Sequence, residues 1–300
     1  MPEQVKTLKC AKPAMIRWLF CLYPRRNPPI APSVTNSQPI GIFDSGIGGL
    51  TVFSAIKKRL PNETLVYLGD TARVPYGTKS AETVVRYARE NAAFLEEKGV
   101  KAVVVACNTA SAVALADLRK RCRVPVLGMV EPGVHAALAA SQAKRIGVVG
   151  TRATIASDAY GALLRELHSN AQVVSVACPL FVPLVEEGWL SGEIVEEITK
   201  RYCAELEYAQ VDTLILGCTH YPLLKDAITK VVGPDVALVD SGEAAAAALA
   251  HLIDNEGIAA PQTRSNDSLF VTDVPGQFEA VARRFLGGMM PEVQRVNLGS

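Results

Sequence analysis

From Pro39 onward, short apolar runs alternate with longer amphipathic stretches. The β-branched run at 102–106 predicts a buried strand, and the 3.6-residue periodicity of 193–208 predicts an amphipathic helix. Because parallel strands need a crossover connection, this repeated alternation favours an α/β fold with parallel sheets covered by helices. The predicted strands are 40–43, 64–68, 102–106, 126–129, 146–150, 173–176, 213–217, 236–239 and 269–272. The predicted helices include 81–98, 110–121, 154–168, 193–208 and 243–254.

Two of the predicted strands end in a lone cysteine that is followed by polar residues. The strand at 102–106 leads into Cys107, and the strand at 213–217 leads into Cys218. Ligands of open α/β sheets bind at this end of the strands, so we expect one pocket lined by a thiol from each of two similar halves. We also expect both thiols at helix starts, where the helix dipole lowers a thiol pKa from about 8.5 toward about 3.5–7.5.

Three kinds of chemistry could use this pair of thiols. A metal site needs about four ligands, and Cys218 with His220 supplies only a fragment of one. Nucleophilic Cys–His catalysis needs one thiol and one base, which leaves the second matched cysteine unexplained. A pair of acid/base thiols on opposite faces of one carbon explains both cysteines, because inversion requires a proton to leave one face and return to the other.

Two further strand-to-helix turns share the sequence Asp-Ser-Gly, at 44–46 and 240–242. Either turn could be a plain N-cap, and the glycine-rich first turn could also hold a small anion on its backbone N–H groups. Its spacing does not match a dinucleotide fingerprint. The loop at 67–77 is equally compatible with a structural turn and a substrate-lining segment. Two such turns and two strand–cysteine junctions indicate a weak internal duplication.

Composition limits the class of protein. The chain has 300 residues, 49% of them hydrophobic, which suffices for two domains. Its 31 basic and 30 acidic residues are interspersed, so nucleic-acid binding is not predicted. Seven irregularly spaced cysteines fit a reducing cytoplasm better than a disulfide framework. The proline-rich, basic segment 1–38 predicts a disordered extension, and its apolar run at 16–23 is far shorter than the roughly 20 residues of a membrane span.

Four motifs occur in order along the chain: FDSGIGG at 43–49, PYG at 75–77, ACNTAS at 106–111 and GCTHYP at 217–222. Together they resemble the motifs of the glutamate racemases, within the aspartate/glutamate racemase superfamily. The resemblance covers 39 to about 291. It implies an isomerase that interconverts L- and D-glutamate without a cofactor or metal and supplies D-glutamate for peptidoglycan.

The resemblance also implies roles for individual residues. Cys107 would be the base that acts on D-glutamate, and Cys218 the base that acts on L-glutamate, assisted by Asp44 and His220. The stretch 181–188 resembles a region that contributes a further carboxylate, for which we prefer Glu186 to its neighbour Glu187. The residues implied to bind the substrate are Asp44, Ser45, Tyr76, Gly77, Asn108, Thr109, Thr151, Thr219 and His220. No Arg lies inside either cysteine motif, so we expect N–H, hydroxyl and amide groups to hold the carboxylates.

Finally, the resemblance implies two similar parallel-sheet domains that face each other across a central cleft. The first would comprise 39–130 together with 240–300, and the second 131–239. A homodimer or a monomer–dimer equilibrium is the implied state. Two rivals stay open: a racemase of another substrate, such as aspartate or a hydantoin, and a binding or regulatory protein. Some glutamate racemases inhibit DNA gyrase, a partner that only the basic segment 1–38 would favour here.

Overall fold

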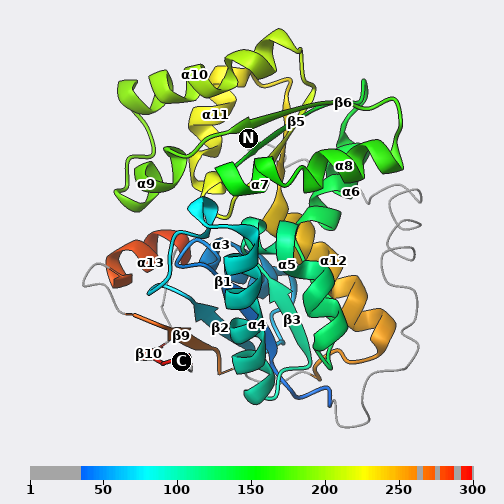
Figure 1. The fold of residues 1–300 in the computed structure, drawn as a ribbon, viewed down its shortest axis with the longest axis vertical. Helices are drawn as coiled ribbons and strands as arrows, with labels where there is room; N and C mark the ends of the chain where they lie inside the picture. Colours follow the sequence, from blue (N-terminus) through cyan, green and yellow to red (C-terminus); the bar gives the residue numbers. More distant parts are fainter. Residues whose placement is uncertain (1–34, 262–265, 274–277, 287–291, 299–300) are drawn as a thin grey trace, which may run out of the picture.

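The structure, a computed structural model, describes residues 35–261, 266–273, 278–286 and 292–298. Its strands form two separate sheets in which every neighbouring pair is parallel, and helices lie on both faces of each sheet (Figure 1). The α/β fold with two parallel-sheet units is confirmed. Among the described residues, no helix is long and apolar enough to cross a membrane.

The first sheet has the strand order β10-β9-β2-β1-β3-β4. The strands at 40–44, 65–69 and 102–105 are completely buried and, apart from Asp44, apolar, as expected for a parallel sheet covered on both faces. The strands are β1 (Ile40–Asp44), β2 (Leu65–Gly69), β3 (Ala102–Val105), β4 (Val126–Leu127), β9 (Ser268–Val271) and β10 (Val293–Arg295). The strand β10 has only three residues, lies at the edge of the sheet and has two exposed side chains, so the sequence pattern does not predict it.

The second sheet has the strand order β6-β5-β7-β8. Its strands are β5 (Arg145–Gly150), β6 (Gln172–Ala177), β7 (Thr213–Gly217) and β8 (Ala237–Asp240). The chain therefore enters this sheet after β4 and returns to the first sheet after β8. We propose that the two sheets mark two domains, with boundaries near Val130 and Asp240.

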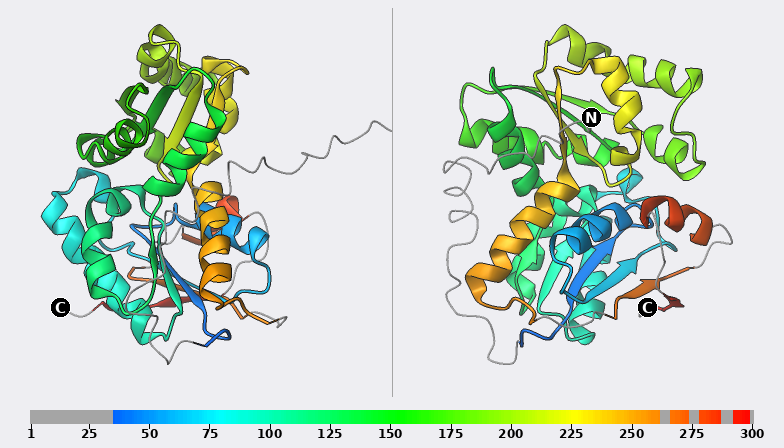
Figure 2. Two further views of the ribbon diagram at one scale, coloured as in Figure 1. Left: turned by 90° about the vertical axis from the view of Figure 1, so that its right-hand side faces the viewer. Right: turned by 180° about the vertical axis from the view of Figure 1, so that it is seen from behind.

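Helices connect and cover the strands. Those around the first sheet are α3 (Leu50–Arg59), α4 (Ala81–Glu97), α5 (Asn108–Arg121), α12 (Ser241–Glu256), α13 (Phe278–Leu286) and the 3₁₀ turn η1 (Tyr76–Thr78). Those around the second sheet are α6 (Val130–Ala140), α7 (Arg152–Ala156), α8 (Ala159–Leu167), α9 (Phe181–Glu186), α10 (Glu193–Tyr208), α11 (Lys225–Val232) and the 3₁₀ turn η2 (Tyr221–Leu224). Figure 2 shows α12 running away from the second sheet along the side of the first.

Two helical predictions differ from the structure. The predicted helix at 154–168 is two helices, α7 and α8, because Asp158 adopts a left-handed conformation with φ of 52°. Neither Asp44 nor Ser45 caps a helix, since α3 begins at Leu50 with Gly49 as its N-cap. Asp240, in contrast, caps α12 by accepting hydrogen bonds from the backbone N–H groups of Gly242 and Glu243.

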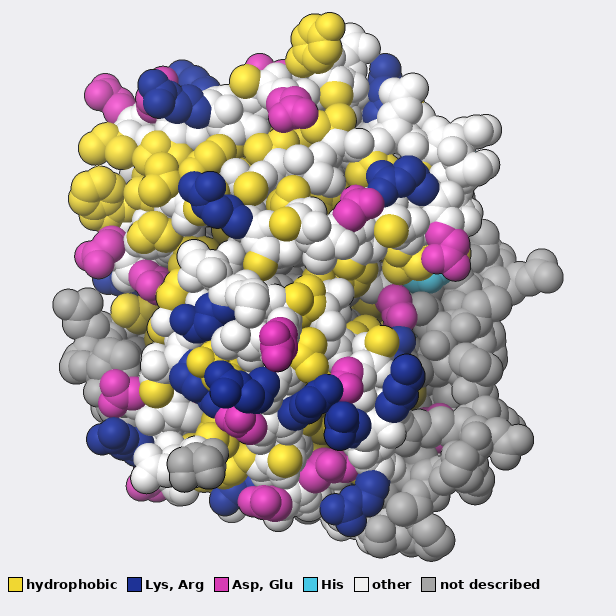
Figure 3. Space-filling view, in the orientation of Figure 1, with side chains coloured by type: hydrophobic (Ala, Val, Ile, Leu, Met, Phe, Trp, Pro, Cys, Tyr) yellow, Lys and Arg dark blue, Asp and Glu magenta, His cyan; other side chains and the backbone are white. Residues whose placement is uncertain are grey.

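The surface carries both signs of charge. Figure 3 shows Lys and Arg side chains mixed with Asp and Glu on the face presented in Figure 1. This arrangement agrees with the interspersed charges of the sequence, whose formal net charge is +1.

Residues 35–38 belong to the segment predicted to be disordered, but they form a turn. A hydrogen bond from a buried side chain holds this turn in place. The ammonium of Lys101, whose side chain is completely buried, donates to the carbonyl oxygens of Asn36 at 2.8 Å and Ile258 at 2.7 Å. The same ammonium pairs with Glu63 at 2.6 Å. The rest of the predicted extension, 1–34, lies outside the described residues.

The Asn36 contact leads to a prediction for two truncations. Removing 1–34 is expected to leave the activity of the protein within a few-fold of the full chain. Removing 1–38 also deletes the Asn36 carbonyl, so a buried ammonium loses an acceptor, at a cost of about 1–3 kcal/mol. Thermal unfolding of both truncations measures the difference, expected as a fall in Tm of several degrees for the longer deletion alone. Equal Tm values would show that the Asn36 contact does not stabilise the fold.

Candidate active site

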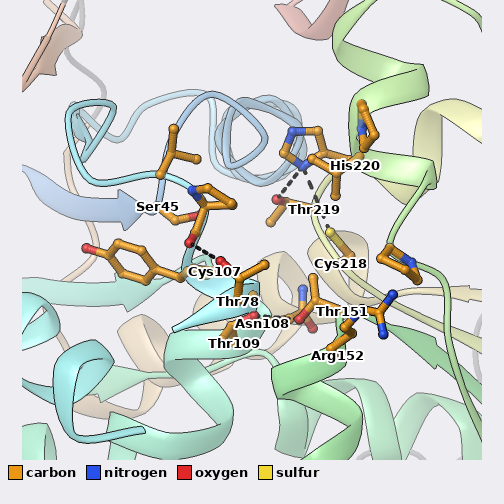
Figure 4. Close-up of a pocket in the computed structure, with 17 residues that line it drawn as sticks. Ser45, Thr78, Cys107, Asn108, Thr109, Thr151, Arg152, Cys218, Thr219 and His220 are labelled. Carbon is orange, nitrogen blue, oxygen red and sulfur yellow. Dashed lines mark hydrogen bonds between the residues drawn. The ribbon is translucent and has the colours of Figure 1, made fainter. Parts of the chain in front are cut away.

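A cavity of about 140 Å³ lies where the carboxyl ends of strands from the two sheets meet (Figure 4). Cys107 follows β3 of the first sheet, and Cys218 follows β7 of the second. Both side chains line the cavity, and each is only 6% exposed. The geometry thus joins two thiols from different sheets, the arrangement expected from the two strand–cysteine junctions.

The two thiols differ in their local structure. Cys107 is the N-cap residue of α5, as expected, whereas Cys218 precedes only the 3₁₀ turn η2 and not an α-helix. The expected low pKa is wrong for Cys107. Burial raises the pKa of this thiol to about 12, and the nearby Asp44 carboxylate adds to the rise. Hydrogen bonds from the α5 backbone and Ser45 oppose the shift but do not outweigh desolvation.

His220 connects Cys218 to a carboxylate. Its Nδ1 lies 3.9 Å from Cys218 Sγ and 3.5 Å from Thr219 Oγ1, as Figure 4 shows, and its Nε2 lies 3.0 Å from Glu186 Oε1. Burial lowers the pKa of His220, but the hydrogen bonds with Cys218 and Glu186 outweigh it and raise the pKa to about 10. Glu186 is outside the cavity lining and reaches the site through His220, while Glu187 is exposed.

Asp44 is completely buried behind the cavity wall and does not line the cavity. Its Oδ2 accepts a hydrogen bond from the Gly46 N–H at 3.0 Å, and its Oδ1 has no hydrogen-bond partner among the described residues. Burial raises the pKa of this carboxyl, and the charge of His220 opposes the rise. The structure therefore brings Asp44 near the thiols and His220 but not into direct reach of the cavity.

The glycines of the first turn let these groups approach one another. A Cβ at Gly48 would lie 2.4 Å from the His220 ring and from Thr219 Oγ1, and one at Gly49 would lie 2.5 Å from the Cβ of Asp44. Only glycine fits these positions without displacing the neighbouring groups. The glycine-rich turn thus packs between Asp44 and His220.

Hydroxyl groups from both sheets form a cluster beside the thiols. Thr109 Oγ1 lies 2.9 Å from Thr151 Oγ1 and 3.1 Å from Thr154 Oγ1. Thr109 and Thr151 line the cavity, as do Ser45, Asn108 and Thr219 of the predicted set. Thr154 was not predicted; it is the third residue after Thr151, which caps α7.

Tyr76 and Gly77 also line the cavity, but the Tyr76 hydroxyl is hydrogen-bonded to other protein side chains. It donates to Asp70 and accepts from Asn91 Nδ2 at 3.0 Å, within a buried network. A Cβ at Gly77 would lie 2.8 Å from Thr151 Cβ, so this glycine is required for close contact between the two halves. Tyr76 can therefore offer a ligand its ring and backbone, while its hydroxyl holds the loop.

Sequence reasoning missed several cavity residues, of which Arg152 matters most chemically. It directly follows Thr151, outside both cysteine motifs, and its side chain is exposed at the cavity. Arg152 and His220 bring positive charge to a lining whose described residues include no Asp or Glu. Such a cavity suits an anionic ligand. Across the part of the chain that the structure describes, no group of three His, Cys, Asp or Glu side chains could hold a metal ion.

Comparisons with known proteins agree with this geometry. A family model described as Asp/Glu/Hydantoin racemase matches residues 45–249. The glutamate racemase of Geobacter metallireducens is 50% identical over 262 residues, which cover 87% of this chain and 97% of the relative. The chain belongs to the glutamate racemases. It is accordingly an isomerase, as the motifs predicted.

Solved structures of the family share the whole fold. The glutamate racemase of Francisella tularensis in complex with D-glutamate has a TM-score of 0.83 at 39% identity, over 88% of this chain and 98% of that one. A glutamate racemase isoform from Bacillus anthracis has a TM-score of 0.85 at 40% identity with the same coverage. The family's two-sheet architecture therefore extends over the described part of this chain.

Proposed function

We propose that this chain interconverts L- and D-glutamate by proton transfer at Cα between two thiols, Cys107 and Cys218, without a cofactor. The observation that carries the proposal is the presence of both thiols in one small cavity, although they follow strands of different sheets. A single base could not remove a proton from one face and return one to the other, whereas two thiols can.

Each turnover balances one proton lost against one gained. A thiolate removes the Cα proton, and the electron pair left on Cα is delocalised into the α-carboxylate. The opposite thiol then donates its proton to the other face, which inverts the configuration and leaves the two sulfurs with exchanged protonation states. Proton exchange with water, or turnover of the opposite enantiomer, restores the starting state.

The electrostatics support a defined starting state. Because burial raises the pKa of Cys107 to about 12, this sulfur is protonated at neutral pH before substrate binds and can act as the acid. Cys218 would then be the base, which removes the Cα proton of L-glutamate. The ammonium group of a bound amino acid would favour the thiolate form of Cys107 for the reverse direction, since a nearby positive charge lowers a thiol pKa.

We assign His220, Asp44 and Glu186 as assisting groups. His220 lies within proton-transfer distance of Cys218, and Glu186 orients its ring from the opposite nitrogen. Asp44 carries an unpartnered carboxylate oxygen close to the same buried cluster. These groups keep the thiols supplied with protons and counter-charge.

Short polar groups would bind the two carboxylates of glutamate. The hydroxyls of Ser45, Thr109, Thr151 and Thr219 surround the cavity, and Arg152 adds a positive charge at its exposed side. Flexible, single-point contacts suit a pocket that must hold both enantiomers, because a rigid bidentate clamp would favour one orientation.

We further propose that the product serves peptidoglycan synthesis and that the enzyme works in the cytoplasm. The proposal is supported by the family resemblance, which implies this role for D-glutamate, and the named relatives are glutamate racemases of bacteria.

A circular-dichroism assay tests the reaction and its substrate. The purified chain is expected to bring solutions of L-glutamate and of D-glutamate to the same racemic end point, with little effect on L- or D-aspartate at equal concentration. Aspartate is shorter by one methylene, so its two carboxylates lie closer together than those of glutamate and would fit contacts placed for glutamate less well. A chain that racemises aspartate faster than glutamate would refute the substrate assignment, and one inactive on both would refute the reaction.

A further inference from the structure

A chain of hydrogen bonds fixes the side-chain amide of Asn108, a cavity residue. The hydroxyl of Tyr160, on α8, donates to Asn108 Oδ1 at 2.5 Å. Asn108 Nδ2 donates to Ser241 Oγ at 3.3 Å, and Ser241 Oγ donates to the Leu216 carbonyl at 3.0 Å. All of these atoms are buried, so the network is shielded from competing water.

The end of this chain determines the direction of every bond in it. The Leu216 carbonyl can only accept, so the single hydroxyl proton of Ser241 is directed toward it. Ser241 must then accept from Asn108, which requires the NH₂ group of the amide on that side. The carbonyl oxygen of the amide consequently faces Tyr160, whose hydroxyl donates to it.

The ring of Tyr160 is closely packed on both edges. A Cβ at Gly133 would lie 3.2 Å from its Cε1, and a Cβ at Gly217 would lie 3.4 Å from its Cε2. Two glycines therefore make room for the ring, which is only 2% exposed. Gly217 also directly precedes Cys218, so the ring is packed against the strand end that carries this thiol.

We propose that Tyr160 and Ser241 are positioning residues that make Asn108 present an N–H, and not its carbonyl oxygen, to a carboxylate of the substrate. An amide nitrogen has two protons, and Ser241 uses one of them. The other has no partner among the described residues, and Asn108 lines the cavity. A flipped amide would direct its oxygen toward the substrate carboxylate and repel it.

The positioning crosses between the two sheets. Asn108 begins α5 of the first sheet, whereas Tyr160 belongs to α8 of the second. Ser241 begins α12, the helix by which the chain returns to the first sheet. The orientation of the amide thus depends on hydrogen bonds between the two halves of the protein. Binding of the substrate carboxylate is therefore linked to the way in which the two halves pack against each other.

This inference rests on the proposed function, and Tyr160→Phe tests it through a split between KM and kcat. The variant keeps the ring but loses the donor to Asn108 Oδ1. We expect KM for both enantiomers to rise about tenfold, the cost of roughly one hydrogen bond, with kcat within about threefold of the wild type. Tyr202→Phe is the control, because Tyr202 lies on α10, outside the cavity lining, and its hydroxyl accepts a hydrogen bond from the Leu180 N–H.

A double-mutant cycle separates positioning from general loss of structure. Asn108→Ala should raise KM, and adding Tyr160→Phe to it should raise KM no further, because the amide to be positioned is gone. Fully additive effects, or a Tyr160→Phe variant with KM within twofold of the wild type, would overturn the proposal. If Tyr160→Phe does not fold, Ser241→Ala takes its place, with the same expected rise in KM and the same cycle.

Calorimetric binding of glutarate distinguishes failure of this inference from failure of the proposed function. Glutarate has both carboxylates but no amino group, and it cannot be racemised. Weaker glutarate binding by Tyr160→Phe than by the wild type supports the inference even if the wild type does not racemise glutamate. Equal glutarate affinity of the two proteins overturns it, whatever the racemase assay shows.

Discussion

Replacing either Cys107 or Cys218 by serine is expected to lower racemisation of glutamate by about 10²–10⁴-fold in both directions. A serine hydroxyl is a far weaker acid than a thiol, so almost none of it is ionised near neutral pH. It therefore cannot be the base in one direction. In the other direction it must be the proton donor, and there too the thiol is the stronger acid. Circular dichroism of each variant with each enantiomer measures the effect. A serine variant that racemises at a near wild-type rate would refute the pair.

Cys122→Ser is a matched control for these variants. Cys122 ends the same helix, α5, that Cys107 begins, and it is buried but lies outside the cavity lining. Its substitution should leave kcat within about twofold of the wild type. A loss of activity as large as that of Cys107→Ser would show that thiols of this helix are required for the fold and not for proton transfer.

Isotope incorporation tests the same pair without changing the protein. In deuterated water, early product should carry solvent deuterium at Cα while the remaining substrate stays protonated, because each face has its own donor. Deuterium that appears equally in recovered substrate and product would indicate one base or a freely exchanging intermediate. That result would contradict the two-thiol mechanism even if both cysteines prove essential.

Motifs that depend on neighbours in sequence were predicted well. The junctions at Cys107 and Cys218 combine a buried strand with polar residues directly after it, so the sequence alone indicated that both thiols would line one pocket. The fold class followed from the strand and helix periodicities for the same reason. Glu186 was found only through the resemblance, since nothing in its own surroundings marks it as a partner of His220.

Features that depend on tertiary packing were not predicted. The pKa of Cys107 rises because the fold buries this thiol near Asp44, and a local helix N-terminus cannot reveal that burial. Tyr160 reaches Asn108 from another sheet and belongs to no motif. The break at Asp158, which creates α8, depends on a left-handed conformation that an aspartate adopts only occasionally.

Equal free energies of the two enantiomers restrict what any variant of this enzyme can do. In achiral solvent L- and D-glutamate have an equilibrium ratio of one, so kcat/KM must be the same in both directions for every variant. A group that assists only Cys218 can therefore make kcat differ between the two directions, and KM likewise. It cannot make kcat/KM differ between them. Equality of kcat/KM between the two directions is therefore an internal check on every racemisation assay of these variants.

His220→Asn is expected to lower kcat for L-glutamate by about a hundredfold and kcat for D-glutamate by less. In the native protein His220 Nδ1 lies 3.9 Å from Cys218 Sγ. Asparagine can fill much of the space of the imidazole but cannot carry a proton to or from this sulfur. Initial rates at saturating concentrations of each enantiomer measure the two kcat values. Equal losses for the two enantiomers, or full activity, would return His220 to a structural role.

Glu186→Gln complements this variant, because it keeps the imidazole and changes only its charge environment. In the native protein the pKa of His220 is about 10, so the protonated ring persists through neutral pH and is lost as pH rises through that value. Removing the carboxylate 3.0 Å from Nε2 lowers this pKa, so the alkaline fall in kcat for L-glutamate should begin at lower pH than in the wild type. The shift is expected even if His220→Asn does not fold. An unchanged alkaline limb would mean that protonated His220 does not take part in the reaction at Cys218.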